Sequence, residues 1–184
     1  MSDEEWAPFN QDEIDIFGND LWCEQDYLAP FWPSTDTRSE GLLNSFDIRN
    51  DDVLYDLGCG DGRILIEAVR KGANKCIGIE YDEALVEKGK EKVREAGLED
   101  KIEIKHGNFL EIDLSDATLI YVFLLPKAVE LLTPRFVALM NAGKLRIIGS
   151  VLYELKEWPY SFISKPEIAS FLYFKEMPNL TNNQ

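Results

Sequence analysis

The chain has 184 residues, of which 45% are hydrophobic and 11% aromatic, and its formal net charge at pH 7 is −15. This length and apolar content predict one globular domain with a sizeable core. The negative charge repels a phosphate backbone, which argues against nucleic acid as the main partner and favours a cationic one, such as a lysine-rich protein. An acidic surface that only maintains solubility is the simpler alternative.

The sequence shows no sign of a membrane span or a secretory signal. No apolar run is long enough to cross a bilayer, and residues 2–5 (SDEE) lack a basic region and an apolar core. Three cysteines, Cys23, Cys59 and Cys76, lack metal-site spacing and do not divide into pairs. We therefore expect a metal-free intracellular protein, with the cytoplasm favoured and a monomer as the simplest state.

The N-terminal 30 residues differ in composition from the rest of the chain. They hold nine acids, five aromatic side chains and no Lys or Arg. We expect this acidic, aromatic arm to pack partly on the domain, as a cover over an apolar patch or as a lid beside the substrate entrance. The domain itself is expected over residues 31–178, and residues 179–184 form a polar tail.

The domain is expected to begin with a short extended segment and a helix. Two prolines fix an extended entry at residues 30–33, after which Ser34 or Thr35 can cap a helix running to about residue 46. The inner face of this helix should carry Leu42, Leu43 and Phe46.

Apolar runs and helical runs then alternate along the chain. Strands are predicted at residues 53–57, 75–80, 102–106, 117–123 and 145–150. Helices are predicted at residues 62–71, 82–96 and 127–140. This alternation predicts a doubly wound, mostly parallel α/β sheet with right-handed crossovers.

The pattern changes after residue 150. Residues 153–159 are predicted to form a loop, and residues 160–164 and 170–175 two strands with no helix between them. Residues 165–167 (KPE) are expected to form the turn between these strands. The sheet should therefore end in an antiparallel pair.

Three glycines follow the first predicted strand at every second position: Gly58, Gly60 and Gly62. A strand, a glycine turn and a helix N-terminus present main-chain N–H groups to a ligand. A dinucleotide fingerprint spaces its glycines Gly-x-Gly-x-x-Gly, so the third glycine here comes one residue early. Asp56 precedes the turn and Glu80 ends the next strand, and the acid at position 56 suits a cation better than a pyrophosphate.

Residues 55–62 (YDLGCGDG) and Glu80 resemble the first motif and the ribose-binding acid of the class I, seven-strand S-adenosylmethionine-dependent methyltransferases. The resemblance implies a Rossmann-like sheet of seven strands and S-adenosyl-L-methionine as the cofactor. It places Gly58 and Gly60 under the methionine part and Asp56 near its ammonium end.

The same resemblance implies the positions of the ribose and the adenine. Glu80 accepts hydrogen bonds from the ribose hydroxyls, and Tyr81 lies beside the adenine. Asn108 takes the adenine-reading position, where many relatives have Asp, and Phe109 is beside it.

A narrower group is similar over most of residues 30–175. Residues 33–34, 55–64, 107–109 and 123–125 and Trp158 recur in the same order in small protein-lysine methyltransferases. These include a broad-specificity crenarchaeal enzyme and the mitochondrial enzymes that act on the adenine nucleotide translocase and the ATP synthase c subunit. The resemblance implies that Ser34 and Thr35 match the cofactor-contacting Ser/Thr of that group, and we expect Trp32 and Ser34 among the cofactor-binding residues. The acidic arm and the lack of a membrane anchor depart from that group, so the substrate does not carry over.

The acceptor is inferred from the loop after the fourth strand, which faces the methyl group in this fold. Residues 121–126 (YVFLLP) contain no acid, amide or His. A lysine must arrive neutral although its free pKa is about 10.4, and an apolar slot beside a cationic cofactor disfavours the ammonium form. No dedicated base is then needed, and the residues expected to line the slot are Phe123, Tyr153 and Trp158.

Other acceptors have signatures that the chain lacks. The Asn/Asp-Pro-Pro-aromatic loop of adenine and glutamine enzymes, the two-glutamate loop of arginine enzymes and the Pro-Cys of cytosine C5 enzymes are absent. The leading hypothesis is therefore an S-adenosylmethionine-dependent protein-lysine methyltransferase. A small-molecule N-methyltransferase and a non-catalytic cofactor-binding subunit are the alternatives.

Overall fold

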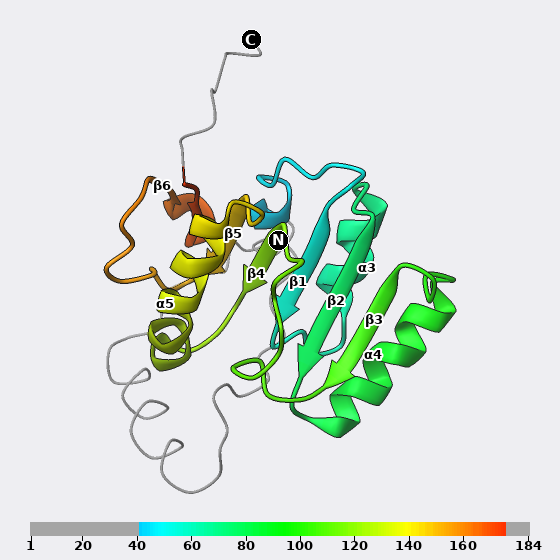
Figure 1. Ribbon diagram of the computed structural model, residues 1–184. Helices are drawn as coiled ribbons and strands as arrows, with labels where there is room; N and C mark the ends of the chain where they lie inside the picture. The colour runs from blue at the N-terminus through cyan, green and yellow to red at the C-terminus, as the bar shows by residue number, and fades with distance from the viewer. Residues whose placement is uncertain (1–40, 176–184) are drawn as a thin grey trace, which may run out of the picture.

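The computed structural model describes residues 41–175 of the chain, which form one α/β unit (Figure 1). The strands are β1 (Val53–Leu57), β2 (Lys75–Glu80), β3 (Ile102–His106), β4 (Leu119–Val122), β5 (Ile147–Val151), β6 (Phe162–Lys165) and β7 (Ser170–Tyr173). The helices are α3 (Arg63–Arg70), α4 (Glu83–Glu95), α5 (Pro126–Ala142) and the 3-10 helix η1 (Pro166–Ile168). The predicted arm at residues 1–30 and tail at residues 179–184 lie outside the described residues.

The strands form one seven-stranded sheet in the order β3-β2-β1-β4-β5-β7-β6. The first five are parallel, and β7 lies antiparallel between β5 and β6. The predicted fold class, a doubly wound and mostly parallel seven-strand sheet with an antiparallel C-terminal pair, is confirmed. The carboxyl ends of β1, β2, β4 and β5 consequently meet at one edge, where ligands bind in open α/β sheets.

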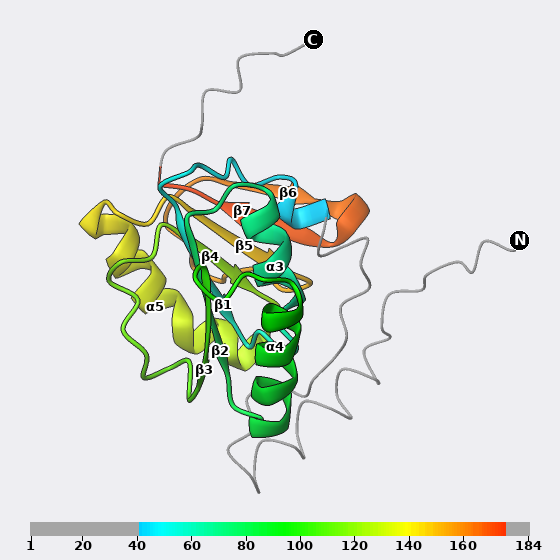
Figure 2. The ribbon, with the colours of Figure 1, turned by 90° about the vertical axis from the view of Figure 1, so that its right-hand side faces the viewer.

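Helices cover both faces of the sheet, with α3 and α4 on one side and α5 on the other (Figure 2). Alternation along β1 explains the two cores, because Leu54 packs with α3 and α4 whereas Tyr55 and Leu57 pack with α5. All four residues of β4 are buried, as expected of a central parallel strand.

The first described residues pack on the face of α3 and α4. Leu42 and Leu43 are fully buried and Phe46 is 6% exposed, which confirms the predicted inner face. A Cβ at Gly149 would lie 2.4 Å from the Phe46 ring, so β5 needs glycine there to let this segment approach. The predicted start of this helix at Ser34 or Thr35 lies outside the described residues.

The predicted elements and the observed ones differ mainly at their ends. The predicted helix at residues 82–96 includes its two caps, since Asp82 accepts hydrogen bonds from the main-chain N–H groups of Ala84 and Leu85. The helix expected at residues 127–140 begins at Pro126, because proline is well suited to the first helical position. The strand expected at residues 117–123 is the shorter β4, and Thr118, directly before it, accepts a hydrogen bond at its hydroxyl from Val53 N–H at the start of β1.

The C-terminal strands are also shifted. The strand expected at residues 145–150 is β5, two residues later at its start and one at its end, and that expected at residues 160–164 is β6. The turn expected at residues 165–167 is the 3-10 helix η1. Its C-cap, Ala169, has φ 45°, and this residue takes the left-handed turn that brings the chain back as β7.

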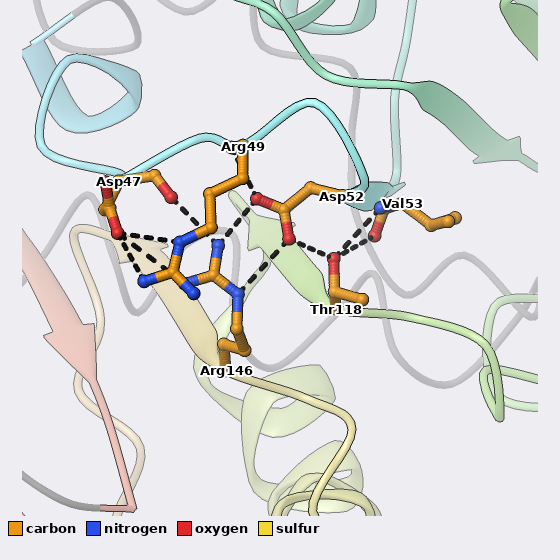
Figure 3. A network of polar contacts seen from close by, with 6 residues as sticks. All are labelled: Asp47, Arg49, Asp52, Val53, Thr118 and Arg146. Atoms are coloured by element: carbon orange, nitrogen blue, oxygen red, sulfur yellow. Dashed lines mark hydrogen bonds and ion pairs between the residues drawn. The ribbon is translucent and has the colours of Figure 1, made fainter.

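A polar network ties the amino ends of the central strands together (Figure 3). Asp52, 1% exposed, directly precedes β1, and its carboxylate accepts hydrogen bonds from Arg146 (2.6 Å) and from the Thr118 hydroxyl (2.7 Å). Arg146 precedes β5, and Thr118 precedes β4 and accepts at its hydroxyl oxygen from Val53 N–H at 2.9 Å. The network therefore sets the mutual register of β1, β4 and β5 from the edge opposite the ligand edge.

Candidate functional site

The glycine turn joins β1 to α3 at the carboxyl edge. Gly58, Gly60 and Gly62 have φ of 81°, 53° and 75°, which lie in the left-handed region where a side chain is strained. Gly58 N–H donates to the Ile79 carbonyl at 2.8 Å, so the turn is fastened to the end of β2. The every-second-residue spacing thus encodes a turn that folds back over the sheet edge.

Close packing is a second reason for glycine here. A Cβ at Gly58 would lie 2.9 Å from a Leu124 methyl carbon, and one at Gly78 would lie 2.5 Å from the Cys59 sulfur. Gly78 is the β2 partner of Asp56 in the sheet. The glycine turn therefore packs directly against the carboxyl-terminal half of β2 and against Leu124 in the segment after β4.

Glu80 ends β2 and fastens the glycine turn. Its Oε2 accepts from Gly60 N–H at 2.8 Å, and its Oε1 accepts from Tyr81 and Asp82 N–H at 2.8 and 3.0 Å. A carboxylate has about four acceptor positions, so about one stays available to a ribose hydroxyl without displacing a main-chain donor. The sequence predicted the ribose contact and missed the bond to the turn.

Asp56 lies in β1 and is 2% exposed. Burial, and then the negative charges of Glu80 and Asp61, raise the pKa of its carboxyl well above the ordinary 3.8. No hydrogen bond from residues 41–175 offsets this burial. A cationic ligand group beside Asp56 would compensate the carboxylate, which is the role the sequence predicted.

Asp61 is a structural acid that was not among the predicted site residues. It is 2% exposed, and its carboxylate accepts from Arg63 at 2.9 Å and from Lys92 of α4 at 2.5 Å. Although burial alone would raise the pKa of Asp61, these two partners lower it below the ordinary value. These bonds hold the turn against α4. The sequence shows only an acid between two glycines, which does not indicate a partner on α4.

The predicted adenine side lies at the ends of β2 and β3. Tyr81 is 45% exposed, and His106 Nε2 lies 2.9 Å from the Tyr81 carbonyl oxygen. Asn108 Oδ1 accepts from Leu110 N–H at 3.0 Å and so shapes the loop after β3. Phe109 is 6% exposed and packs in the core under α5, which makes it a support for this loop.

Arg135 also shapes this loop and was not found in the sequence. It reaches from α5 and donates to the carbonyl oxygens of Phe109 and Leu110 at 3.3 and 3.1 Å. A lone arginine on a helix gives no sequence signal for a contact with a loop 25 residues earlier.

The structure divides the predicted acceptor residues between the two faces of the sheet. Phe123 packs against the core on the side of α3 and α4. Tyr153 and Trp158 pack against the core on the side of α5, and Trp158 lies edge-on to Tyr173 with centroids 5.3 Å apart. Leu124 packs on the side of α5 and is 2% exposed. Trp32 and Ser34, the remaining predicted site residues, lie outside the described part of the chain.

The arrangement suits S-adenosylmethionine. The three glycines of the turn give close access to main-chain groups, Asp56 offers a buried carboxylate to an ammonium group, and Glu80 keeps acceptor capacity for a ribose hydroxyl. Among residues 41–175, no group of three His, Cys, Asp or Glu side chains is arranged to bind a metal ion. No helix in the same range is long and apolar enough to cross a membrane.

Solved structures share this architecture. A structure titled as an RNA methyltransferase from Salinibacter ruber, in complex with S-adenosyl-L-homocysteine, superposes with a TM-score of 0.66 and 30% identity. The match covers 83% of this chain and 100% of that one. A precorrin-6y C5,15-methyltransferase from Geobacter metallireducens, at 13% identity and a TM-score of 0.61, shares the fold. Fold and site together define a class I, S-adenosylmethionine-dependent methyltransferase.

Sequence relatives narrow the class. The model of the ANTKMT methyltransferase domain matches residues 56–161. A protein-lysine N-methyltransferase of Saccharolobus islandicus is 31% identical over 140 residues, which cover 76% of this chain and 86% of the relative. The chain belongs to the ANTKMT methyltransferase domain family.

A second group of relatives is longer. A ribosomal protein L11 methyltransferase of Clostridium botulinum (strain Alaska E43) is 31% identical over 153 residues. The match covers 82% of this chain but only 46% of that protein, so the chain spans just under half of this relative.

Proposed function

We propose that the chain transfers methyl groups from S-adenosylmethionine to lysine side chains of a protein. The observation that carries the proposal is the segment after β4, where Phe123, Leu124 and Leu125 lead directly into α5 without an acid, amide or His. A lysine amine that enters such an apolar segment is driven toward its neutral, nucleophilic form. The name of the Saccharolobus relative supports the same acceptor.

One set of residues would bind the cofactor, and another would align the lysine acceptor. Glu80 and the glycine turn would bind the ribose and methionine parts, with Asp56 beside the ammonium group. Bound cofactor supplies an electrophilic methyl group on a sulfonium. Phe123 and Tyr153, which follow the ends of β4 and β5, would flank the lysine stem and exclude water, which aligns the amine and prevents hydrolysis. Trp158 packs farther along the α5 face, against Tyr160 and Tyr173, and would support this side of the slot.

RNA is a second candidate acceptor, because the similar Salinibacter structure is that of an RNA methyltransferase. A net charge of −15 opposes RNA binding, since a phosphate backbone is attracted by Lys and Arg. We therefore rank protein above RNA and above a small amine.

The test is methyl transfer into a cell extract. The protein and methyl-labelled S-adenosylmethionine are incubated with the extract. Small molecules are then separated from macromolecules, and portions of the macromolecular fraction are digested with protease or with ribonuclease. We expect label in protein, and methyl-lysine after acid hydrolysis. Label that is released by ribonuclease alone, or only in small molecules, would refute the lysine proposal.

We further propose a monomer that acts in a reducing compartment, the cytoplasm. Cys59 and Cys76 are buried free thiols, and burial raises the pKa of Cys76 to about 12. Such thiols stay protonated and unreactive. Size-exclusion chromatography with light scattering tests whether the protein is a monomer, and cell fractionation tests whether it is cytoplasmic.

A further inference from the structure

The chain makes a strained turn where β5 ends. Tyr153 N–H donates to the Val151 carbonyl at 2.9 Å, a bond that spans two residues and closes a γ-turn centred on Leu152. Leu152 has φ 67°, which places the turn in the rare class with positive φ. A branched side chain at positive φ costs conformational energy and persists only where its surroundings determine it.

Two hydrogen bonds fix this turn from opposite sides. The hydroxyl of Ser150, a residue with no exposed surface, donates to the Tyr153 carbonyl at 2.6 Å. Leu152 N–H donates to the Ala169 carbonyl at 2.7 Å, which connects the turn to the segment before β7. Ser150 is the only side chain among residues 41–175 that bonds the main chain of Tyr153.

The turn sets where Tyr153 emerges. Ser150 is paired with Val122, the last residue of β4, so Tyr153 leaves the sheet beside the segment that begins at Phe123. Tyr153 packs against the core under α5, and burial raises the pKa of its phenol. The chain stays attached to the sheet two residues later, where Leu155 N–H donates to the Tyr173 hydroxyl of β7 at 2.7 Å.

We propose that Ser150 is a positioning residue for methyl transfer: its hydroxyl holds the strained turn that places Tyr153 at the acceptor side of the carboxyl edge. The inference rests on the proposed function, in which Tyr153 lines the acceptor slot. Strain is retained at Leu152 because relaxing it would move Tyr153 away from the segment after β4.

The decisive variants are Ser150→Ala and the double variant Ser150→Ala/Leu152→Gly. Without the hydroxyl, Leu152 is free to relax to negative φ and Tyr153 shifts. Glycine adopts positive φ without strain, so the double variant should regain the turn through the remaining bond to Ala169. Ser170→Ala is the matched control, because Ser170 is 1% exposed and its hydroxyl likewise donates to a carbonyl, that of Ile168.

Two measurements are made on each protein. Amide hydrogen exchange of the ligand-free protein should show Tyr153 N–H exchanging at least tenfold faster in Ser150→Ala, with recovery in the double variant. The initial rate of label transfer into the extract should fall at least tenfold and recover in parallel, while affinity for S-adenosylhomocysteine stays within twofold throughout. Ser170→Ala should change neither the exchange at Tyr153 nor the rate.

The outcomes separate the two proposals. An unchanged transfer rate in Ser150→Ala, or an equal loss in Ser170→Ala, would overturn the positioning role. A loss that Leu152→Gly fails to restore would show that Ser150 acts only through packing, and would also overturn it. Wild-type protein that labels RNA or small amines would overturn the lysine proposal, and the same variants then test Ser150 on that acceptor.

Discussion

Two carboxylates at the cofactor edge have opposite surroundings. Glu80 accepts three main-chain N–H groups, whereas Asp56 is buried beside other acids with no hydrogen bond from residues 41–175. Main-chain donors stabilise a charged carboxylate, and burial disfavours one. The two residues should therefore respond differently to neutral isosteres.

Replacing Glu80 with Gln should weaken cofactor binding. The amide keeps one oxygen but directs an NH2 group toward either Gly60 N–H or the N–H groups of Tyr81 and Asp82. The amide also offers the ribose hydroxyl a neutral acceptor in place of a charged one, and loss of a hydrogen bond to a charged group costs about 1.5–3 kcal/mol, which is roughly a 10- to 100-fold lower affinity for S-adenosylhomocysteine by calorimetry. Glu83→Gln, an exposed change three residues later, is the control, and equal affinities of the two variants would contradict the role.

Replacing Asp56 with Asn should separate stability from binding. A carboxyl whose folded-state pKa lies above its unfolded value stabilises the fold when protonated, and this contribution is lost as pH rises through the folded pKa. Asp56→Asn should therefore unfold at a higher temperature than wild type, by a margin that grows from pH 4 to pH 8. Its affinity for the cationic S-adenosylmethionine should fall about tenfold, by loss of the charge pair. A margin independent of pH would show that Asp56 ionises normally.

At the scale of elements, the amino edge of the sheet depends on Arg146. Arg146→Met would leave the Asp52 carboxylate buried with only Thr118 and one main-chain N–H as partners. Removing one member of a buried pair costs about 3–5 kcal/mol, and we expect about 2–4 kcal/mol in urea unfolding, because Arg146 is 24% exposed. Arg49→Met is the control, since the Arg49–Asp47 pair is exposed at 54% and 70% and should contribute little.

The same pair predicts a pH dependence. Burial opposes ionisation of Asp52, but hydrogen bonds from Arg146 and Thr118 lower its pKa below the ordinary 3.8. The contribution of ionised Asp52 to the free energy of unfolding is therefore present above its unfolded-state pKa and is lost as pH falls through its folded-state pKa. The difference between wild type and Arg146→Met should shrink below about pH 4, and a constant difference would mean that Asp52 is not the partner that matters.

Most strands and helices could be predicted from the sequence, because each depends mainly on residues that are close together in the chain. The strands at residues 53–57, 75–80 and 102–106 were predicted with the bounds observed, since short runs rich in apolar residues end there in glycine, acid or turn residues. The site contacts arise between elements far apart in sequence. The Asp61–Lys92 clamp and the Arg135 bonds to the loop after β3 carry no periodic signal, and the γ-turn at Leu152 contradicts the usual preference of leucine.

At the scale of the molecule, charge is the property that the sequence alone establishes and the fold does not alter. The chain has 34 acidic and 19 basic residues besides its one His, and this excess gives a long-range attraction for basic proteins and a repulsion for nucleic acids. The proposed cofactor site is different, because Asp56 is buried and Glu80 is held by main-chain hydrogen bonds, and salt screens such groups weakly.

Methyl transfer to a lysine-rich protein should therefore depend on salt while cofactor binding does not. Between about 0.02 and 0.3 M salt the Debye length shortens from roughly 20 Å to about 6 Å, so exposed charges stop attracting a distant partner. We expect kcat/KM for a basic protein acceptor to fall at least fivefold over this range, mainly through KM, with kcat and the affinity for S-adenosylhomocysteine within twofold. A kcat/KM that is flat in salt would show that the net charge of −15 serves solubility alone, and would place acceptor recognition in short-range contacts at the carboxyl edge.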